Sequence, residues 1–312
     1  MKYQKPFLKW VGGKTQIIDE IVDKFPSEIK DYHELFLGGG SVLFALLTLQ
    51  KEKKIKITGK IYAYDFNPNL INLYKIVQSQ KDKLFEQVNK LVEVYHSLKQ
   101  ETNKELVNRK PENLLEAKGC KENYYYYLRM RFNSLLLDGV LEKDNEEEKI
   151  EFAALFLFLN KTCFRGVYRE SGNGFNVPYG HHKTTPTVVT KEELDKISSL
   201  IKEVEFKRLT FKESIKNPNE GDFVYMDPPY APENKTSFVK YVKDGFTEEC
   251  HKLLFSEIIK LNERNVKFCL SNSKVTMVTE SLKDFKIKEI EARRAIHSKK
   301  PGSKTVEVII TN

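Results

Sequence analysis

The chain has 312 residues, of which 40% are hydrophobic, so it can bury a substantial core and form one or two globular domains. Lys and Arg outnumber Asp and Glu by 52 to 44, and the resulting formal charge of +8 suits a polyanionic partner without requiring one. This composition excludes a wholly disordered chain, and the longest strongly apolar run, which begins at Phe152, is far shorter than the roughly 20 residues of a membrane-spanning helix.

The first ten residues lack the apolar stretch of a signal peptide, so we expect no secretion and no membrane association. The four cysteines, Cys120, Cys163, Cys250 and Cys269, have no CxxC spacing. That pattern argues against a zinc site and favours free thiols in a reducing compartment. We therefore expect a cytoplasmic protein that binds no metal.

In chain order, predicted strands and helices alternate at both ends of the chain, and the middle is mostly helical. Residues 32–47 and 59–77 each read as a short strand that turns through Gly, Asp or Asn into an amphipathic helix. The middle of the chain predicts helices at 84–98, 124–136 and 150–164. It also predicts an acidic loop at 142–149 and a Gly-rich hairpin at 164–186. The alternation then returns with helices at 191–203 and 247–264, strands at 221–226 and 266–272, and two strands around a basic loop within 287–312.

This order predicts an α/β fold in which one sheet is built from both chain ends. We assign residues 1–76 and 190–312 to the sheet domain and residues 77–189 to a mostly helical insertion.

A glycine-rich turn follows the first of these predicted strands. The sequence LFLGGGS places Gly38 and Gly40 where a strand meets a helix, so that a ligand can approach the backbone and the helix N-terminus. Asp65 ends the next strand, where a carboxylate can accept both hydroxyls of a ribose. A purely structural turn remains an alternative, and the third glycine of a dinucleotide fingerprint would fall on Leu43.

The N-terminal segment FLKWVGGKTQII contains the only tryptophan, Trp10, close to Lys14. These residues fit a core tryptophan beside a capping turn. They also fit a site in which Trp10 stacks on a planar ligand and Lys14 neutralises an anionic group.

The segment GDFVYMDPPYAP ends an apolar strand on Asp227, two prolines and Tyr230. Prolines cannot donate ladder hydrogen bonds, so they end the strand and hold Asp227 extended at its C-terminal edge, where open α/β sheets bind ligands. The Asp227 carboxylate, the Pro228 carbonyl and the Tyr230 ring together suit a planar exocyclic amine. A strand-ending turn with an exposed tyrosine is the structural alternative.

Several segments, taken in order, resemble the motifs of one enzyme family: PFLKWVGGK, ELFLGGGSV, YDFNPNLINLY, FLFLNKTCFRGVYR, FNVPYG, DFVYMDPPYAP, LSNS and RRAI. With these motifs the chain resembles the Dam-type N6-adenine DNA methyltransferases over nearly its whole length. The resemblance implies a Rossmann-like sheet that binds S-adenosylmethionine, with residues 77–189 as the target recognition domain.

The resemblance also implies the roles of individual residues. Those matching the cofactor site are Trp10, Lys14, Phe36, Gly38, Gly40, Asp65 and Asp227. The methyl group would pass directly to the adenine amine, leaving S-adenosylhomocysteine. Asp227 and Pro228 would accept the two N–H bonds of that amine, and Tyr230 would stack on the flipped base.

For DNA recognition, the resemblance implies that Phe164 wedges into the duplex, that Arg169 reads a guanine and that Lys9 contacts the first base of the site. Arg165 and the pair His181 and His182 depart from the pattern of GATC enzymes. GATC is therefore the first expectation, and CATG or another short palindrome stays open. The basic loop 292–304 is expected to grip phosphates.

The implied partner is double-stranded DNA. We expect the protein to be a monomer or a weak dimer of prokaryotic or viral origin, and a cognate restriction endonuclease stays open as a second partner. Rival hypotheses are methylation of another amine, such as cytosine in DNA or an RNA base, and a DNA-binding protein that has lost catalysis. A dinucleotide oxidoreductase is a more distant alternative.

Overall fold

A computed structural model describes residues 2–231, 246–293 and 304–312. The chain divides into two compact units. The first comprises Met1–Lys5, Gly12–Phe66 and Glu203–Asn312, and the second comprises Pro6–Val11 and Asn67–Lys202. The units divide after Phe66 and after Lys202, and the second also takes up Pro6–Val11. The predicted domain boundaries at 76 and 190, with the catalytic and recognition roles assigned to the two parts, stay predictions.

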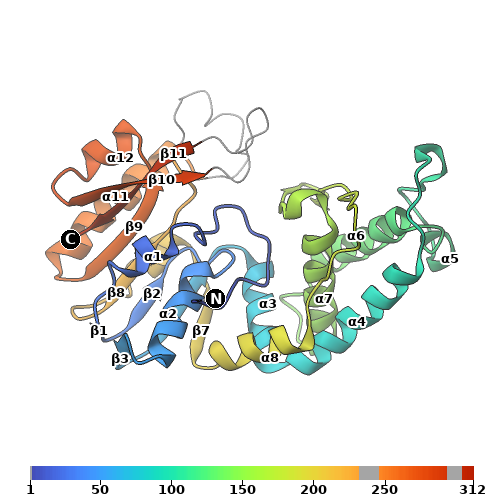
Figure 1. The fold of residues 1–312 in the computed structure, drawn as a ribbon, viewed down its shortest axis with the longest axis horizontal. Coiled ribbons are helices and arrows are strands. Elements are labelled where there is room, and N and C mark those ends of the chain that lie inside the picture. The colour runs from blue at the N-terminus through green and yellow to red at the C-terminus, as the bar shows by residue number, and fades with distance from the viewer. Residues whose placement is uncertain (1, 232–245, 294–303) are drawn as a thin grey trace. The chain divides into compact units, whose positions relative to one another are not determined.

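A seven-stranded sheet forms the centre of the first unit, in the order β10-β11-β9-β8-β2-β4-β7. Its strands are β2 (Tyr32–Glu34), β4 (Ile61–Asp65), β7 (Val204–Arg208), β8 (Phe223–Met226), β9 (Lys267–Ser273), β10 (Lys286–Arg293) and β11 (Lys304–Thr311). The neighbours from β9 to β7 pair in parallel, whereas β11 is antiparallel to both β9 and β10. Figure 1 shows blue elements from the N-terminal part beside orange and red ones from the C-terminal part. The predicted α/β sheet from both chain ends is confirmed.

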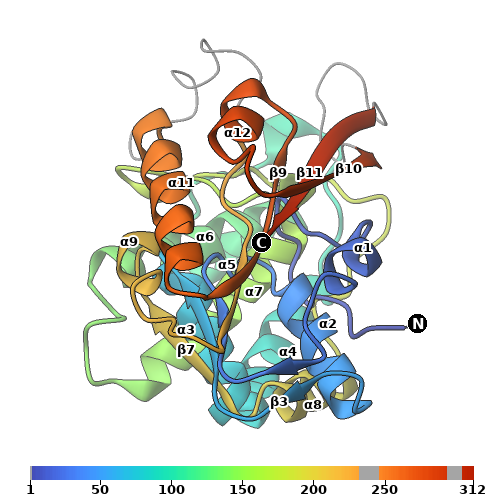
Figure 2. The same ribbon diagram turned by 90° about the vertical axis from the view of Figure 1, so that its left-hand side faces the viewer.

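Helices cover both faces of this sheet (Figure 2). They are α1 (Ile18–Val22), α2 (Ser41–Lys51), α9 (Phe211–Ser214), α11 (Glu248–Glu263) and α12 (Thr276–Ser281). On one face, Val224 and Met226 of β8 belong to a core cluster with Leu254 and Ile258 of α11. The alternate residues of β8, Phe223 and Tyr225, point to the other face, where the ring of Phe223 lies 4.7 Å from that of Phe25. Because both faces are covered, the central strands β2 and β8 are buried throughout rather than alternating with exposed positions.

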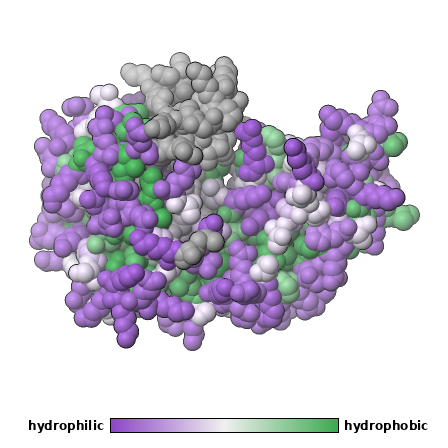
Figure 3. All heavy atoms as spheres, in the orientation of Figure 1, coloured by the Kyte–Doolittle hydropathy of each residue, from purple (hydrophilic) through white to green (hydrophobic). Residues whose placement is uncertain are grey.

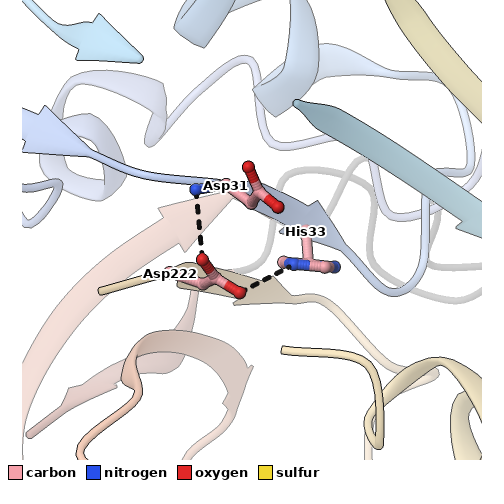
Figure 4. A group of neighbouring side chains, drawn as sticks. All are labelled: Asp31, His33 and Asp222. Carbon is pink, nitrogen blue, oxygen red and sulfur yellow. Dashed lines mark hydrogen bonds and ion pairs between the residues drawn. The ribbon is translucent and has the colours of Figure 1, made fainter. Parts of the chain in front are cut away.

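A polar network connects the N-terminal ends of the parallel strands β2 and β8 (Figure 4). Asp222 accepts backbone N–H groups from Asp31 at 3.2 Å and from Asn219 at 2.7 Å, and lies 3.4 Å from His33 Nε2. The Asp31 carboxylate accepts the N–H of Lys60 at 2.7 Å. The ligand atoms of Asp31, His33 and Asp222 lie within 4.8 Å of one another. Since these carboxylates already bind backbone donors, we interpret the group as a connection between strand starts and not as a metal site. A short parallel pair, β1 (Glu28–Ile29) with β3 (Lys56–Ile57), lies in the same unit.

The second unit is mostly helical, as predicted for the middle of the chain. It contains α3 (Pro68–Ser79), α4 (Lys81–Ser97), η1 (Lys104–Leu106), α5 (Leu114–Ala117), α6 (Lys121–Leu137), α7 (Glu146–Thr162), η2 (Phe164–Gly166) and α8 (Lys191–Leu200), with a hairpin of β5 (Glu170–Ser171) and β6 (Gly174–Phe175). Helix α7 packs against α3, α4 and α6. Its residues from Phe152 to Asn160 are all buried, which makes α7 the centre of this unit.

One local prediction was wrong. The acidic run at 142–149 was expected to be a loop, but Glu146, Glu147 and Glu148 form the first turn of α7. The side chain of Asn145 caps this turn by accepting the N–H of Glu148. Carboxylates at a helix N-terminus interact favourably with the helix dipole, so this charge run starts a helix.

The face in Figure 3 is coloured mainly as hydrophilic, with hydrophobic residues in scattered patches. None of the helices in the described part of the chain combines the length and the apolar character that a membrane crossing requires.

A pH-dependent stability is expected from His251, which is fully buried on α11 with its ring centroid 4.6 Å from that of Phe246. Burial lowers the pKa of His251 from 6.5 to about 4. Between these values the unfolded chain binds a proton that the folded chain does not, so this contribution to stability is present above pH 6.5 and is lost as the pH falls toward 4.

Replacing His251 with Leu should therefore weaken the pH dependence of the unfolding free energy by on the order of 1 kcal/mol per pH unit in this window. Urea unfolding of both proteins at pH 7, 6 and 5 measures the difference. If the unfolding free energies of the two proteins changed with pH by the same amount, the pKa of His251 would not be lowered by folding.

Candidate functional site

The glycine-rich turn leads directly from β2 into α2. Gly38 has φ of 50° and Gly40 has φ of 71°, both in the left-handed region that disfavours residues with a Cβ. Gly40 is the N-cap of α2. The turn therefore needs glycine at these two positions, and it brings the backbone to the N-terminus of an eleven-residue helix.

Asp65 lies beside this turn because β4 pairs in parallel with β2. Its Oδ2 accepts the N–H of Gly38 at 2.9 Å. Phe36 comes from the same turn and packs its ring against those of Phe211, at 6.0 Å, and Phe246, at 5.7 Å. The structure thus brings together four of the predicted cofactor residues: Phe36, Gly38, Gly40 and Asp65.

Asp227 lies on the other side of β2, because β8 also pairs with that strand. As predicted from the two prolines, β8 ends at Met226. Asp227 Oδ2 forms an ion pair of 2.7 Å with Lys14, and Oδ1 accepts the hydroxyl of Ser271 at 3.0 Å. Burial raises the pKa of Asp227 above its ordinary value, while Lys14 and Ser271 counteract this rise.

Lys14 is anchored at the same edge. Its backbone N–H donates to Ser41 Oγ at 3.1 Å, and its ammonium group donates to the Gly12 carbonyl at 2.6 Å. The ammonium nitrogen also lies 4.6 Å from the centroid of the Tyr230 ring. A carboxylate and an aromatic face therefore hold a primary amine between them.

Sequence reasoning missed several residues that support this arrangement. Glu307 of β11 accepts the hydroxyl of Tyr230 at 2.6 Å. After the double proline, Ala231 donates its N–H to Asn272 at 3.2 Å, and its carbonyl accepts the hydroxyl of Ser273 at 2.6 Å. The signal was the run of polar residues in LSNS, which a buried strand would not otherwise contain.

Glu34 at the end of β2 was also missed. It is 1% exposed and accepts the hydroxyl of Tyr32 at 2.7 Å. Burial raises the pKa of Glu34 to about 8, and the carboxylates of Asp227 and Asp65 add to the rise. This edge therefore carries three neighbouring carboxyl groups, and the raised pKa of Glu34 favours its protonated form at neutral pH.

Predicted DNA contacts gather near the C-terminal end of α7 in the second unit. The side chain of Asn160 accepts the N–H of Lys9 at 2.9 Å and donates to the Lys9 carbonyl at 2.7 Å. A Cβ on Gly166 would come within 2.5 Å of the Lys9 side chain, so only glycine allows this close approach. Lys9 itself is exposed, and its backbone is fixed beside Phe164 to Gly166.

Phe164 and Arg165 are also exposed, with the guanidinium of Arg165 5.1 Å from the centroid of the Phe164 ring. Arg165 has φ of 57°, an uncommon conformation that turns the chain after α7. Arg169 begins the hairpin and donates through Nε to Asn176 Oδ1 at 2.7 Å. This bond holds one edge of the guanidinium and restricts its orientation.

The two histidines have different surroundings. His181 is exposed and lies 3.5 Å from the buried carboxylate of Glu122. His182 lies 3.2 Å from the carbonyl of Thr162, and burial lowers its pKa. Trp10, predicted for the cofactor site, belongs to the second unit, where its ring stacks on that of Tyr168 at 5.6 Å. Its role in cofactor binding stays a prediction.

A mostly parallel sheet with a glycine turn and two carboxylates at its carboxyl edge is typical of the methyltransferase type of α/β fold. A sequence model describing the D12 class N6 adenine-specific DNA methyltransferases matches residues 10–296. The chain belongs to this family, and the prediction of an adenine-specific DNA methyltransferase is confirmed at this level.

Relatives of similar length agree with this assignment. The type II methyltransferase M.MjaIII of Methanocaldococcus jannaschii is 36% identical over 95% of this chain and 93% of its own length. The type II methyltransferase M1.LlaDCHI of Lactococcus lactis is 33% identical over 99% and 95%. A DNA adenine methylase of Escherichia coli is 28% identical over the same two shares.

The protonated Glu34 gives a testable pH effect. Its folded-state pKa is raised, so its contribution to stability is present below pH 4.5 and is lost as the pH rises toward 8. Glu34→Gln keeps an acceptor for Tyr32 but cannot ionise. The stability of this variant relative to the wild type should therefore increase by on the order of 1 kcal/mol per pH unit between pH 5 and 8.

Chemical unfolding at pH 5, 6, 7 and 8 measures this difference, and Glu112→Gln, at an exposed glutamate, is the matched control. A constant difference between Glu34→Gln and wild type across this range would show that Glu34 is ionised in the folded protein.

Proposed function

We propose that this enzyme transfers a methyl group from S-adenosylmethionine to the N6 amine of an adenine flipped out of a short palindromic site in duplex DNA. The observation that carries the proposal is the amine already held at this edge, where Lys14 lies 2.7 Å from Asp227 Oδ2 and 4.6 Å from the centre of the Tyr230 ring. The neutral exocyclic amine of a base can likewise donate an N–H to this carboxylate, and the flat base can stack on the same aromatic ring.

In this proposal the adenine amine takes the place of the Lys14 ammonium on Asp227. One N–H donates to Asp227 Oδ2 and the other to the Pro228 carbonyl, which directs the nitrogen lone pair toward the methyl donor. The carbon–nitrogen bond would form as the carbon–sulfur bond of the donor breaks, which leaves S-adenosylhomocysteine. Positive charge develops on the nitrogen during transfer, the carboxylate stabilises it, and the methylated amine would then lose one N–H proton to water. Glu307 supports this geometry by fixing the Tyr230 hydroxyl, so that the ring stands ready to stack on the base.

The residues of the glycine turn fit the methyl donor. The left-handed conformations of Gly38 and Gly40 keep side chains away from the path of a ligand, and Asp65 beside them supplies a carboxylate suited to ribose hydroxyls. Phe36, Lys14 and Trp10 are assigned to the same ligand. When bound, S-adenosylmethionine supplies a methyl group on a sulfonium, which is a good leaving group and makes a covalent enzyme intermediate unnecessary.

The second unit supplies DNA recognition in this proposal. Phe164 is exposed, as a residue that fills the space of a flipped base must be, and the exposed cations Lys9, Arg165 and Arg169 suit a polyanion. GATC is the favoured target because Lys9, Phe164 and Arg169 match the motifs of the Dam-type family that the chain resembles, and an arginine can pair with guanine through two donors. CATG or another palindrome is distinguished by sequencing DNA from cells that express the protein, with detection of modified bases. The basic loop 292–304, proposed to contact phosphates, lies largely outside the described residues.

Asp227→Ala should abolish methyl transfer, because the amine loses the acceptor that orients it and that stabilises its charge. Asp227→Asn keeps an oxygen of the same shape without the charge, and we expect a loss of at least roughly 100-fold in kcat. Transfer of tritiated methyl to duplex DNA measures the loss, and binding of S-adenosylmethionine and of DNA to each variant serves as the control. Near-normal turnover of Asp227→Ala would contradict the proposed catalytic role of Asp227.

Arg169→Ala should relax specificity at one base pair, with a loss of discrimination of about 1–3 kcal/mol at that position. Arg131→Ala is the matched control, because Arg131 is a partly exposed arginine of the same unit that forms a two-point ion pair with Glu151. Sequencing of methylated sites after expression of each variant reports the change. The same target profile in wild type and Arg169→Ala would exclude Arg169 from base recognition.

A further inference from the structure

Behind Asp227, a chain of hydrogen bonds runs into the sheet. Ser271 Oγ lies 3.0 Å from Asp227 Oδ1, and the hydroxyl of Tyr225 lies 2.9 Å from Ser271 Oγ. Both Ser271 and Tyr225 are buried, at 0% and 1% exposure. The three groups therefore form a relay that starts in the core and ends at the proposed catalytic carboxylate.

Strand pairing accounts for this alignment. β9 is parallel to β8, with Tyr225 opposite Cys269 and Met226 opposite Leu270. The next step of the register brings Ser271 level with Asp227, just where the prolines end the pairing of β8. A serine at this position of β9 can reach the carboxylate, whereas the neighbouring Asn272 bonds the later Ala231.

The chemistry fixes the direction of the relay. An ionised carboxylate only accepts, so Ser271 must donate its single hydroxyl proton to Asp227. The Tyr225 hydroxyl must then donate to Ser271. The relay occupies Oδ1 from inside the protein, and Oδ2 is the oxygen that holds the Lys14 ammonium.

We infer that Ser271, oriented by Tyr225, is a positioning residue that fixes the Asp227 carboxylate so that Oδ2 faces the substrate amine. This inference rests on the proposed function of Asp227. Free rotation of the carboxylate would present the amine with varying geometry, and reaction rates fall steeply when reacting groups are misplaced by about 1 Å. The hydrogen bond also favours the charged carboxylate, in opposition to its burial.

Ser271→Ala tests the inference. We expect kcat to fall by roughly 10- to 100-fold, as for loss of a hydrogen bond to a charged group, with little change in KM for DNA or for S-adenosylmethionine. Without the donor the pKa of Asp227 rises further, so the acid limb of the kcat–pH profile should move to higher pH. A loss of packing alone would not produce that shift.

Tyr225→Phe provides a graded comparison, because Ser271 can still donate to Asp227 after its own donor is lost. It should move the acid limb in the same direction by a smaller amount. Tyr64→Phe is the matched control: Tyr64 is also a buried strand tyrosine, but its hydroxyl contacts His33 at the opposite edge of the sheet. Tyr64→Phe should leave the profile of the wild type unchanged. Thermal unfolding of every variant checks the fold.

The outcomes separate the two proposals. An active wild type whose kcat and pH profile are unaffected by Ser271→Ala overturns the positioning role and leaves the proposed function standing. Lower kcat without a shift of the acid limb also overturns it, because it indicates a structural role. A wild-type enzyme that transfers no methyl to adenine contradicts the proposed function itself.

Discussion

The parallel pairing of β2 with both β4 and β8 is the constraint on which the site depends. It places the ends of three strands side by side, so that Asp65, the glycine turn and Asp227 meet although more than 160 residues separate the two carboxylates in sequence. The starting edge is held in turn by Asp222, whose bonds to Asp31 and Asn219 link the beginning of β8 to that of β2. These hydrogen bonds fix the N-terminal ends of the parallel strands, and the candidate site lies at their C-terminal ends.

Charge at that edge is balanced by protonation and pairing. Ionising Glu34, which is buried beside two other carboxyl groups, carries a large cost. Here the raised pKa of Glu34 favours its neutral form, the charge of Asp227 is compensated by Lys14 and Ser271, and Asp65 accepts a backbone N–H. Under the proposed function, the Lys14 ammonium would have to leave Asp227 when the substrate amine enters, and its bond to the Gly12 carbonyl links that movement to the segment between Gly12 and Lys14.

In the second unit, exposed side chains lie near the end of a buried and well-packed helix. The buried helix α7 ends in a turn that exposes Phe164 and Arg165, and Asn160 near its end holds the backbone of Lys9, which lies 151 residues away in sequence. Residues proposed to contact DNA have to be exposed, and exposed residues receive little orientation from packing. Hydrogen bonds to their backbones, as at Lys9, or to their side chains, as between Arg169 and Asn176, supply it instead.

The sequence by itself determined the class of fold, the elements that carry the site and the end of β8 at the double proline, because these follow from local periodicity and from the backbone limits of proline and glycine. It also indicated Asp65 and Asp227 through their places at strand ends. It misassigned the acidic start of α7, since a charge run has the same composition in a loop and at a helix N-terminus. Only the tertiary structure decided which side chains support the site. Ser271, Glu307 and Asn160 act on residues that strand register and helix packing bring to them. The polar run LSNS marks Ser271 as unusual for a buried strand, but the local sequence pattern does not say which residue it contacts.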